Sequence, residues 1–322
     1  DGGEQIEDRY IQCHSHDYGG HGMVDLSGAL EKSCNDALMQ IAAKEGIALF
    51  DKYQVLFGFG QSTNVDLPGE PSDSSLSGLV YHADNMGAVS LAISSFGQGV
   101  TTSMMQVGTA FCSAINGGYY YEPSVVQRIE DENGNIVRNL DPVLVRRTIS
   151  EDVSAQMRQF LKNVVSEGTG KKATVEGYEI GGKTGTAEKL PRGNGKYILS
   201  FIGFAPVDDP QVVIYVVADE PELQSGSGEA AHLFADIAEA IFPYLNIYKT
   251  DETYDIDEAT AEDEPATPIY GGEAPANDVA GGSDNPYVEQ SEGETTTETT
   301  TEDPSATTEA PAQDTTQEAP TG

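Results

Sequence analysis

Lysine, threonine and glycine occur together at Lys183-Thr184-Gly185, within a glycine-rich stretch that runs from Gly181 to Thr186. Glycine weakens a strand, so several glycines in one strand suggest that another backbone or a substrate approaches it closely. The lysine would offer a positive charge to a carboxylate, and a neighbouring main-chain N–H could donate to a developing oxyanion. Because a tripeptide match often arises by chance, a structural hairpin with a solvated lysine is the alternative.

A second polar motif, Ser33-Cys34-Asn35, lies where two predicted helices meet. Ser27 can cap the first of these helices, and the second carries its apolar face on Leu38, Ile41 and Ala42 and ends at Gly46. Taken alone, the motif favours a structural role, in which Ser33 or Asn35 caps the second helix.

Residues 1–22 are polar and place Cys13, His14, His16 and His21 close together in the sequence. Cysteine and histidine can hold zinc. This spacing matches no common zinc site, however, and no second Cys/His pair follows downstream. We therefore expect a loop with incidental imidazoles and no metal.

The Lys-Thr-Gly motif is predicted to lie on the first strand of a β-hairpin. A turn rich in glycine and asparagine, residues 191–195, joins it to the apolar run Ile198–Ala205. Residues 212–218 are apolar on both faces, which predicts a central, covered strand. A closing helix would pack on this sheet through Leu233, Ile237 and Ile241.

Further helices and a second hairpin complete the predicted domain. Residues 47–60 predict a short helix, another helix begins near residues 101–102, and Ser150 caps the clearest helix of the chain. The buried stripe of that last helix is Val153, Met157, Phe160, Leu161, Val164 and Val165. Asn133-Gly134 predicts a surface hairpin, and residues 71–88 predict a surface loop that could cover the site.

The chain has 322 residues and a net charge of −36, which argues against nucleic acid or an anionic membrane surface as a partner. Residues 251–322 carry 20 of the 53 Asp and Glu and none of the 17 Lys and Arg. They are rich in Thr, Pro and Ala, so we expect a disordered tail. The predicted organisation is one folded domain over residues 1–248 and an acidic tail over residues 249–322.

Three cysteines, Cys13, Cys34 and Cys112, are too few for a disulfide framework. No apolar run approaches the roughly 18 residues of a membrane span. The chain opens with Asp1 rather than Met, and we expect it to be a piece of a longer protein.

Together, the two polar motifs match the second and third active-site motifs of penicillin-binding proteins and serine β-lactamases. Further segments follow in the order that the family shows, namely residues 58–60, 66–70, 95–99, 116–118 and 167–170. Over residues 10–247 the chain resembles the transpeptidase domain of class B penicillin-binding proteins, of the division and sporulation type in Gram-positive bacteria. The resemblance implies an α/β (α+β) transpeptidase fold of the serine β-lactamase type, with an antiparallel sheet flanked by helices.

The nucleophile of this family is the serine of a Ser-x-x-Lys motif, which does not occur in these 322 residues. We expect it upstream, together with its helix, the first strands of the sheet and an N-terminal membrane anchor. The N-terminal part of the fold would then be missing, the sheet would keep one uncovered edge, and the chain alone would show no turnover.

The resemblance implies serine acyl transfer at the D-Ala-D-Ala end of a peptidoglycan stem peptide, without a cofactor. Ser33 would relay a proton, Asn35 would bind the substrate amide, and Lys183 would strengthen the positive field. Thr184 would bind the substrate carboxylate, and the N–H of Thr186 would form half of the oxyanion hole. The implied site residues are Ser33, Asn35, Lys183 and Thr186 for catalysis and Thr184 and Gly185 for substrate binding.

The partners that the resemblance implies are the stem peptide, β-lactam antibiotics and the division or sporulation machinery. The implied location is the extracytoplasmic face of the bacterial membrane. Two alternatives stay open, a β-lactam-binding sensor domain and a non-catalytic scaffold of the division complex. The enzyme interpretation requires Ser33 and Lys183 to face each other across one groove.

Overall fold

The computed structural model describes residues 2–70, 78–222 and 228–250. Residues 251–322 of the predicted tail therefore lie outside the described residues, as do residues 71–77 of the predicted surface loop, and the boundary at residue 248 stays a prediction. The helices are α1 (Leu26–Glu31), α2 (Asn35–Glu45), α3 (Ile47–Leu56), α4 (Ala88–Ser95), α5 (Met104–Ile115), α6 (Glu151–Ser166) and α7 (Gly228–Ile241). The strands are β1 (Gly3–Ile6), β2 (Arg9–Gln12), β3 (Tyr119–Tyr121), β4 (Arg128–Glu130), β5 (Ile136–Asn139), β6 (Leu144–Arg147), β7 (Gly181–Glu188), β8 (Tyr197–Ala205) and β9 (Val212–Asp219).

Three antiparallel strands form the main sheet, in the order β7-β8-β9. Lys183 of β7 lies opposite Ile202 of β8, which lies opposite Tyr215 of β9. The hairpin predicted for the Lys-Thr-Gly stretch is therefore confirmed. Within the described residues, however, β8 is the central strand and β9 has a strand neighbour on one side only. The prediction that residues 212–218 form the central strand is wrong for this part of the chain.

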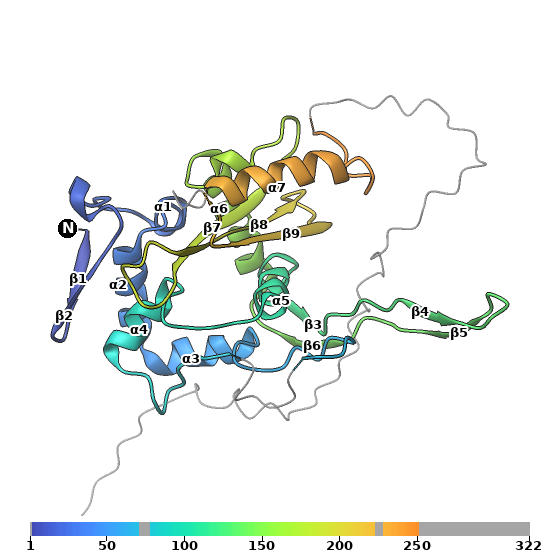
Figure 1. Cartoon of the computed structure of the whole chain (residues 1–322), viewed down its shortest axis with the longest axis horizontal. Helices are drawn as coiled ribbons and strands as arrows, with labels where there is room; N and C mark the ends of the chain where they lie inside the picture. The colour runs from blue at the N-terminus through green and yellow to red at the C-terminus, as the bar shows by residue number, and fades with distance from the viewer. Residues whose placement is uncertain (1, 71–77, 223–227, 251–322) are drawn as a thin grey trace, which may run out of the picture. The chain divides into compact units, whose positions relative to one another are not determined.

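Helices cover both faces of this sheet, with α7 on one face and α5 and α6 on the other (Figure 1). Phe201 packs edge to face on Phe234 of α7, with ring centroids 4.8 Å apart. On the opposite face, Phe204 packs on Phe111 of α5 at 5.9 Å. Side chains alternate across a strand, so β9 also packs apolar groups on both faces. Its two-sided apolar pattern reflects these two helical layers rather than a central position.

Helix α7 packs on the sheet as predicted at Ile237 and Ile241, but not at Leu233. Leu233 is 47% exposed, whereas Phe234 is fully buried. Ile237 and Ile241 are partly buried beside it. The buried stripe consists of Ala230, Ala231, Phe234 and Ala238. The prediction relied on large aliphatic residues, but the small alanines let the helix approach the strands closely.

The N-terminal part differs from the prediction in three elements. Residues 1–22 contain the antiparallel hairpin of β1 and β2 rather than only a loop. Helix α1 is capped by Asp25, whose carboxylate accepts from the N–H of Gly28 at 2.8 Å, and not by Ser27. Helix α4 was not predicted, because Gly87 at its N-cap offers no side chain to signal a start.

Capping explains where α5 and α6 begin. Ser103 and Gln106 form a capping box at the start of α5, just after the predicted start at residues 101–102. Ser150 accepts from the N–H of Val153 and caps α6, as predicted. Val153 itself is 45% exposed, so the predicted stripe is wrong at its first member, whereas Leu161, Val164 and Val165 are buried. The hairpin predicted around Asn133-Gly134 is confirmed by the pairing of β4 with β5, which extends away from the sheet (Figure 1).

Candidate active site

The two polar motifs meet in the folded chain. The Nζ of Lys183, on β7, lies 2.9 Å from the Oγ of Ser33 and donates to it. Helix α2 is capped at Cys34 without a side-chain hydrogen bond, so neither Ser33 nor Asn35 caps it. The structural alternative for the Ser-x-Asn motif is therefore wrong, and the expected facing of Ser33 and Lys183 is found.

Ser33 owes its position to the way α1 ends. The N–H of Ser33 donates to the carbonyl of Leu30 at 3.1 Å, and the N–H of Cys34 donates to the carbonyl of Ala29 at 2.8 Å. These two bonds form a Schellman motif, whose left-handed position is usually glycine. Ser33 occupies that position with φ of +51°. A serine in this strained conformation indicates that the hydroxyl matters more than the local stability.

Ser33→Gly is expected to have a free energy of unfolding about 1 kcal/mol higher than that of Ser33→Ala, because glycine adopts positive φ without strain. Ser33→Ala is the matched control, since alanine also lacks the hydroxyl but keeps the strained conformation. Urea unfolding of the two variants measures the difference. A glycine variant no more stable than the alanine variant would contradict the assigned strain.

Lys183 is a half-buried cation. Burial lowers the pKa of Lys183 to about 8. Besides Ser33, its ammonium donates to the carbonyl of Thr184 at 3.0 Å and lies 3.3 Å from the Thr184 hydroxyl. Among the described residues, no carboxylate forms an ion pair with it. A half-buried cation that is hydrogen-bonded on the protein side and has no acidic partner favours an anionic ligand, and it is not the solvated lysine of the structural alternative.

Thr184 is held from a second element. Its hydroxyl lies 3.0 Å from that of Thr169, in the loop after α6. The N–H of Thr169 in turn donates to the carbonyl of Glu31 at the end of α1, at 3.0 Å. A Cβ on Gly168 would lie 2.5 Å from this same carbonyl oxygen, so only glycine permits the approach. This loop therefore joins the end of α1 to β7 beside the site.

The main chain of Thr186 faces away from β8. The side-chain amide of Gln98 donates to the carbonyl of Thr186 at 3.3 Å. In an antiparallel strand the N–H and C=O of one residue point to the same side. The N–H of Thr186 therefore points to this same side of β7, where it can donate a hydrogen bond to an oxyanion.

Gly185 and Asn35 each make a contact outside the Ser33–Lys183 pair, and their roles in binding stay predictions. A Cβ on Gly185 would lie 2.4 Å from the Oγ of Ser200, so glycine leaves room for this side chain of the neighbouring strand. The amide of Asn35 lies 3.5 Å from the carbonyl of Gln12, at the end of β2, and the structure does not bring it to Lys183.

Three residues near the site were not predicted as members of it. Thr169 and Gln98 contact Thr184 and Thr186, as described above. The third is His14, whose pKa is lowered by burial and by the positive charge of Lys183. The segments 95–99 and 167–170 marked two of these regions in the sequence, but tertiary contacts of single polar side chains leave no periodic signal.

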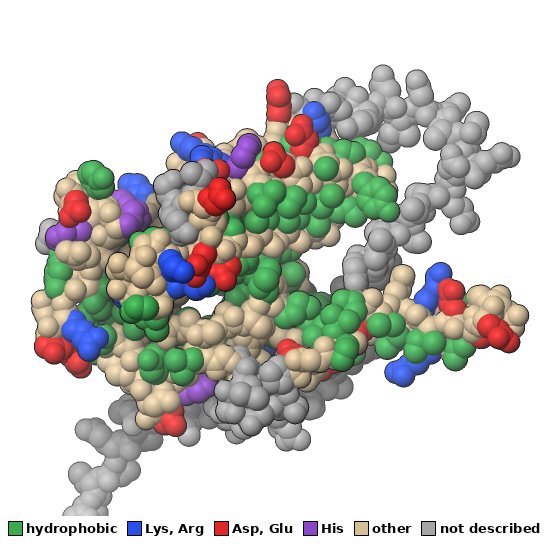
Figure 2. All heavy atoms as spheres, in the orientation of Figure 1, with side chains coloured by type: hydrophobic (Ala, Val, Ile, Leu, Met, Phe, Trp, Pro, Cys, Tyr) green, Lys and Arg blue, Asp and Glu red, His purple; other side chains and the backbone are tan. Residues whose placement is uncertain are grey.

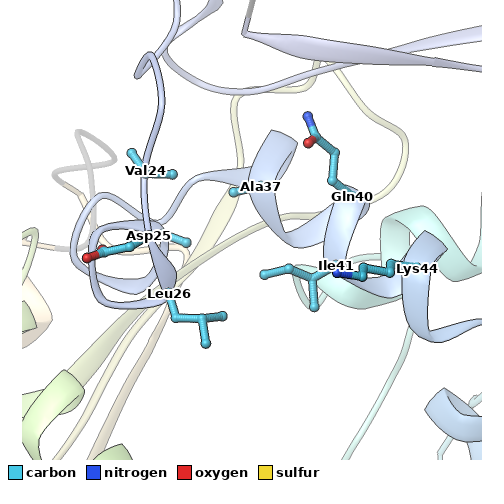
Figure 3. A pocket seen from close by; sticks show the side chains of 8 residues that line it. Val24, Asp25, Leu26, Ala37, Gln40, Ile41 and Lys44 are labelled. Carbon is cyan, nitrogen blue, oxygen red and sulfur yellow. The ribbon is translucent and has the colours of Figure 1, made fainter.

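A separate cavity of about 400 Å³ lies between α1 and α2. Figure 3 shows Val24, Asp25 and Leu26 on one side of it and Gln40, Ile41 and Lys44 of α2 on the other. None of the predicted site residues lines it. Its lining therefore gives no reason to place the chemistry there.

The fold and the site together define a class of protein. An antiparallel sheet covered by helices, with a Lys-Thr-Gly strand whose lysine donates to the serine of a Ser-x-Asn turn, is the arrangement of penicillin-recognising acyltransferases. The family model of the penicillin binding protein transpeptidase domain matches residues 1–239. The chain belongs to this family, which confirms the predicted resemblance.

Several relatives agree with this assignment. Stage V sporulation protein D of Bacillus subtilis (strain 168) is 36% identical over 252 residues, which are 76% of this chain and 38% of that protein. Penicillin-binding protein PbpB of Mycolicibacterium smegmatis is 31% identical over 244 residues, 70% of this chain and 37% of that protein. The chain thus spans somewhat more than a third of the length of these relatives.

Solved structures confirm the predicted fold. The transpeptidase domain of penicillin-binding protein 3 from Burkholderia pseudomallei aligns with a TM-score of 0.66 and 27% identity, over 78% of this chain and 72% of that one. Mycobacterium tuberculosis penicillin-binding protein 3, complexed with ampicillin, aligns with a TM-score of 0.66 and 25% identity, over 79% of this chain and 57% of that one. No helix among the described residues is long and apolar enough to cross a bilayer.

Proposed function

We propose that this chain supplies one wall of the active site of a peptidoglycan D,D-transpeptidase, which crosslinks stem peptides by serine acyl transfer. The observation that carries the proposal is the 2.9 Å contact between Lys183 Nζ and Ser33 Oγ. Local sequence signals alone interpret Lys183 as a solvated lysine and Ser33 as a helix cap, whereas the fold brings the two side chains into contact. Relatives named as probable peptidoglycan D,D-transpeptidases support the same reaction.

The contact is suited to proton transfer. With a pKa of about 8, Lys183 exists in both protonation states near neutral pH. General acid–base catalysis is most efficient when the pKa of the group lies near the working pH. Lys183 can therefore pass a proton to Ser33, and Ser33 can pass its own hydroxyl proton to the leaving amine of the terminal D-Ala.

The open side of β7 would hold the substrate. The hydroxyl of Thr184, which contacts Thr169 and the ammonium of Lys183, would donate to the terminal carboxylate. The N–H of Thr186 would then stabilise the oxyanion of the tetrahedral intermediate. Asn35, at the start of α2, would bind the substrate amide after its weak contact with Gln12 is replaced.

The nucleophile of the reaction would come from a Ser-x-x-Lys motif, which these 322 residues do not contain. We accordingly expect the chain alone to form no acyl-enzyme. The whole protein would act on the extracytoplasmic face of the membrane, held by an anchor. The similarity to a stage V sporulation protein favours a role in the cell-wall synthesis of sporulation or division.

Labelling with a fluorescent penicillin tests the proposal in the protein translated from the complete reading frame that contains this chain. We expect a covalent band, and a second-order labelling rate that Thr184→Val lowers about 10-fold to 100-fold, because a hydrogen bond to a charged group contributes about 1.5–3 kcal/mol. Thr174→Val, at an exposed threonine that is not one of the predicted site residues, is the matched control.

Two outcomes would overturn the enzyme interpretation. Absence of a covalent band would favour the non-catalytic scaffold. A band without release of D-Ala from a D-Ala-D-Ala peptide would favour the β-lactam sensor.

A further inference from the structure

Two cysteines and a histidine from separate segments converge beside the site. The Sγ atoms of Cys13 and Cys34 and a ring nitrogen of His21 all lie within 4.8 Å of one another. The Sγ of Cys13 is 3.7 Å from the Nδ1 of His21. A tetrahedral zinc ion, with Zn–S of about 2.3 Å and Zn–N of about 2.0–2.1 Å, places sulfur and nitrogen ligands about 3.6 Å apart. The observed spacing is thus close to that of a bound ion.

The fold brings these three side chains together, although their spacing in the sequence does not indicate it. Cys13 follows β2 and is anchored by its N–H, which donates to the carbonyl of Gly2 at 2.8 Å. Cys34 is the N-cap residue of α2. The two cysteines are 2% and 4% exposed, and His21 is half-buried. The expectation of no metal relied on residues 1–22, which alone show no zinc pattern. Cys34 lies outside that segment, at the start of α2.

A candidate for the fourth ligand, His14, lies next to Cys13 and outside the group of three. The Nδ1 of His14 lies 3.8 Å from the Sγ of Cys13, and its ring meets that of His21 edge to face at 5.0 Å. Figure 2 shows histidine side chains gathered over this N-terminal region. Cys₂His₂ is a common ligand set of structural zinc sites, and thiolates select zinc over magnesium or calcium.

We propose that Cys13, His21 and Cys34, completed by His14, bind one zinc ion or a similar thiophilic divalent cation. The ion would join the segment after β2 to the start of α2. Since Cys34 follows Ser33 directly, the same bonds would hold the turn that presents the Ser33 hydroxyl to Lys183. The site is thereby structural and lies outside the reacting groups.

Cobalt titration tests this site in the untagged 322-residue chain, purified under reducing conditions and stripped of metal. We expect one equivalent of Co²⁺ to produce thiolate-to-cobalt charge-transfer absorption, and one equivalent of Zn²⁺ to displace it. Cys13→Ser and Cys34→Ser should each weaken the binding at least 100-fold, and His21→Gln at least 10-fold. Cys112→Ser, in α5, and His16→Gln are matched controls, which should bind as the unmodified chain does.

X-ray absorption of the zinc-loaded, unmodified chain keeps the proposal testable if a variant fails to fold. Two sulfur ligands near 2.3 Å and two nitrogen ligands near 2.0–2.1 Å are expected. No binding at micromolar metal, or equal loss in the controls, would overturn the proposal. The protein could also be isolated with Cys13 and Cys34 joined in a disulfide, which lowers its mass by two hydrogens. If reduction of this disulfide did not improve cobalt binding, the proposal would be overturned as well. Each of these results is independent of penicillin labelling.

Discussion

Replacing Lys183 with methionine is expected to lower the rate of penicillin acylation by about 10²–10⁴-fold in the complete protein. The variant keeps the length of the side chain but removes the charge and the proton that Ser33 receives at 2.9 Å. Loss of one general acid–base group or one preorganised donor costs about this much. The measurement is the second-order rate constant of labelling with a fluorescent penicillin.

A double-mutant cycle with Ser33→Ala identifies the cause of this loss. Because Ser33 and Lys183 act through one hydrogen bond, the double variant should be about as slow as the slower single variant. If the two effects multiplied instead, the residues would work independently, and the proposed proton relay would be wrong.

The same substitution should make the folded chain more stable at pH 7. The pKa of Lys183 falls from 10.5 to about 8, so the native state binds fewer protons than the unfolded state between these two values. The contribution of Lys183 to the free energy of unfolding therefore rises with pH between these two pKa values. At pH 7, where the ammonium is charged in both states, its burial destabilises the folded chain. After allowing for the lost hydrogen bonds, we expect Lys183→Met to add about 1–2 kcal/mol at pH 7 and less at pH 10.

Urea unfolding of the chain at the two pH values checks this expectation. A methionine variant that is less stable at pH 7 would show that the hydrogen bonds of Lys183 outweigh its burial. A pH-independent difference would contradict the lowered pKa.

Replacing Gly118 with alanine is expected to destabilise the domain by about 3–5 kcal/mol. A Cβ at this position would lie 2.0 Å from the carbonyl oxygen of Ile149, and the residue has φ of +92°. The carbonyl of Gly118 also accepts from the N–H of Thr148 at 2.7 Å, so the backbone cannot move away without breaking this bond. The strain and the overpacking then add together.

Two glycines provide matched controls for the two parts of this cost. Gly134 has φ of +81°, and a Cβ there would meet no atom within 4 Å, so Gly134→Ala should cost only about 1 kcal/mol from the conformation. Gly108, inside α5, is also uncrowded, and Gly108→Ala should stabilise the chain by about 0.5–1 kcal/mol. Thermal or urea unfolding gives all three values. A Gly118 effect no larger than that of Gly134 would mean that the turn relaxes.

Local sequence signals predicted an element correctly where a single residue determines the local backbone geometry. Ser150 marks the start of α6 and Asn133-Gly134 marks a hairpin, because capping and turn formation depend on neighbouring atoms. Predictions from local signals were wrong where a residue distant in the sequence determines which side chain is buried. Leu233 and Phe234 are both apolar, and only the position of Phe201 selects which of them is buried.

The candidate site shows the same division. Ser33 and Lys183 were paired through the family resemblance, since neither motif alone indicates the other. Thr169, Gln98 and His14 were missed because their contacts depend on how the loops after α6, α4 and β2 fold back on β7. The ligand Cys34 was likewise hidden from any spacing rule, because helix α1 lies between it and His21.

The partly buried charge of Lys183 has a consequence for how an anionic peptide reaches it. The chain carries a net charge of −36, so at long range it repels a carboxylate. At physiological ionic strength that repulsion fades over about 8 Å, whereas the partly buried ammonium is screened far less. If the substrate is the proposed stem peptide, it would gain attraction only after its terminal carboxylate is already beside β7. Recognition at this wall depends on contact rather than on electrostatic steering.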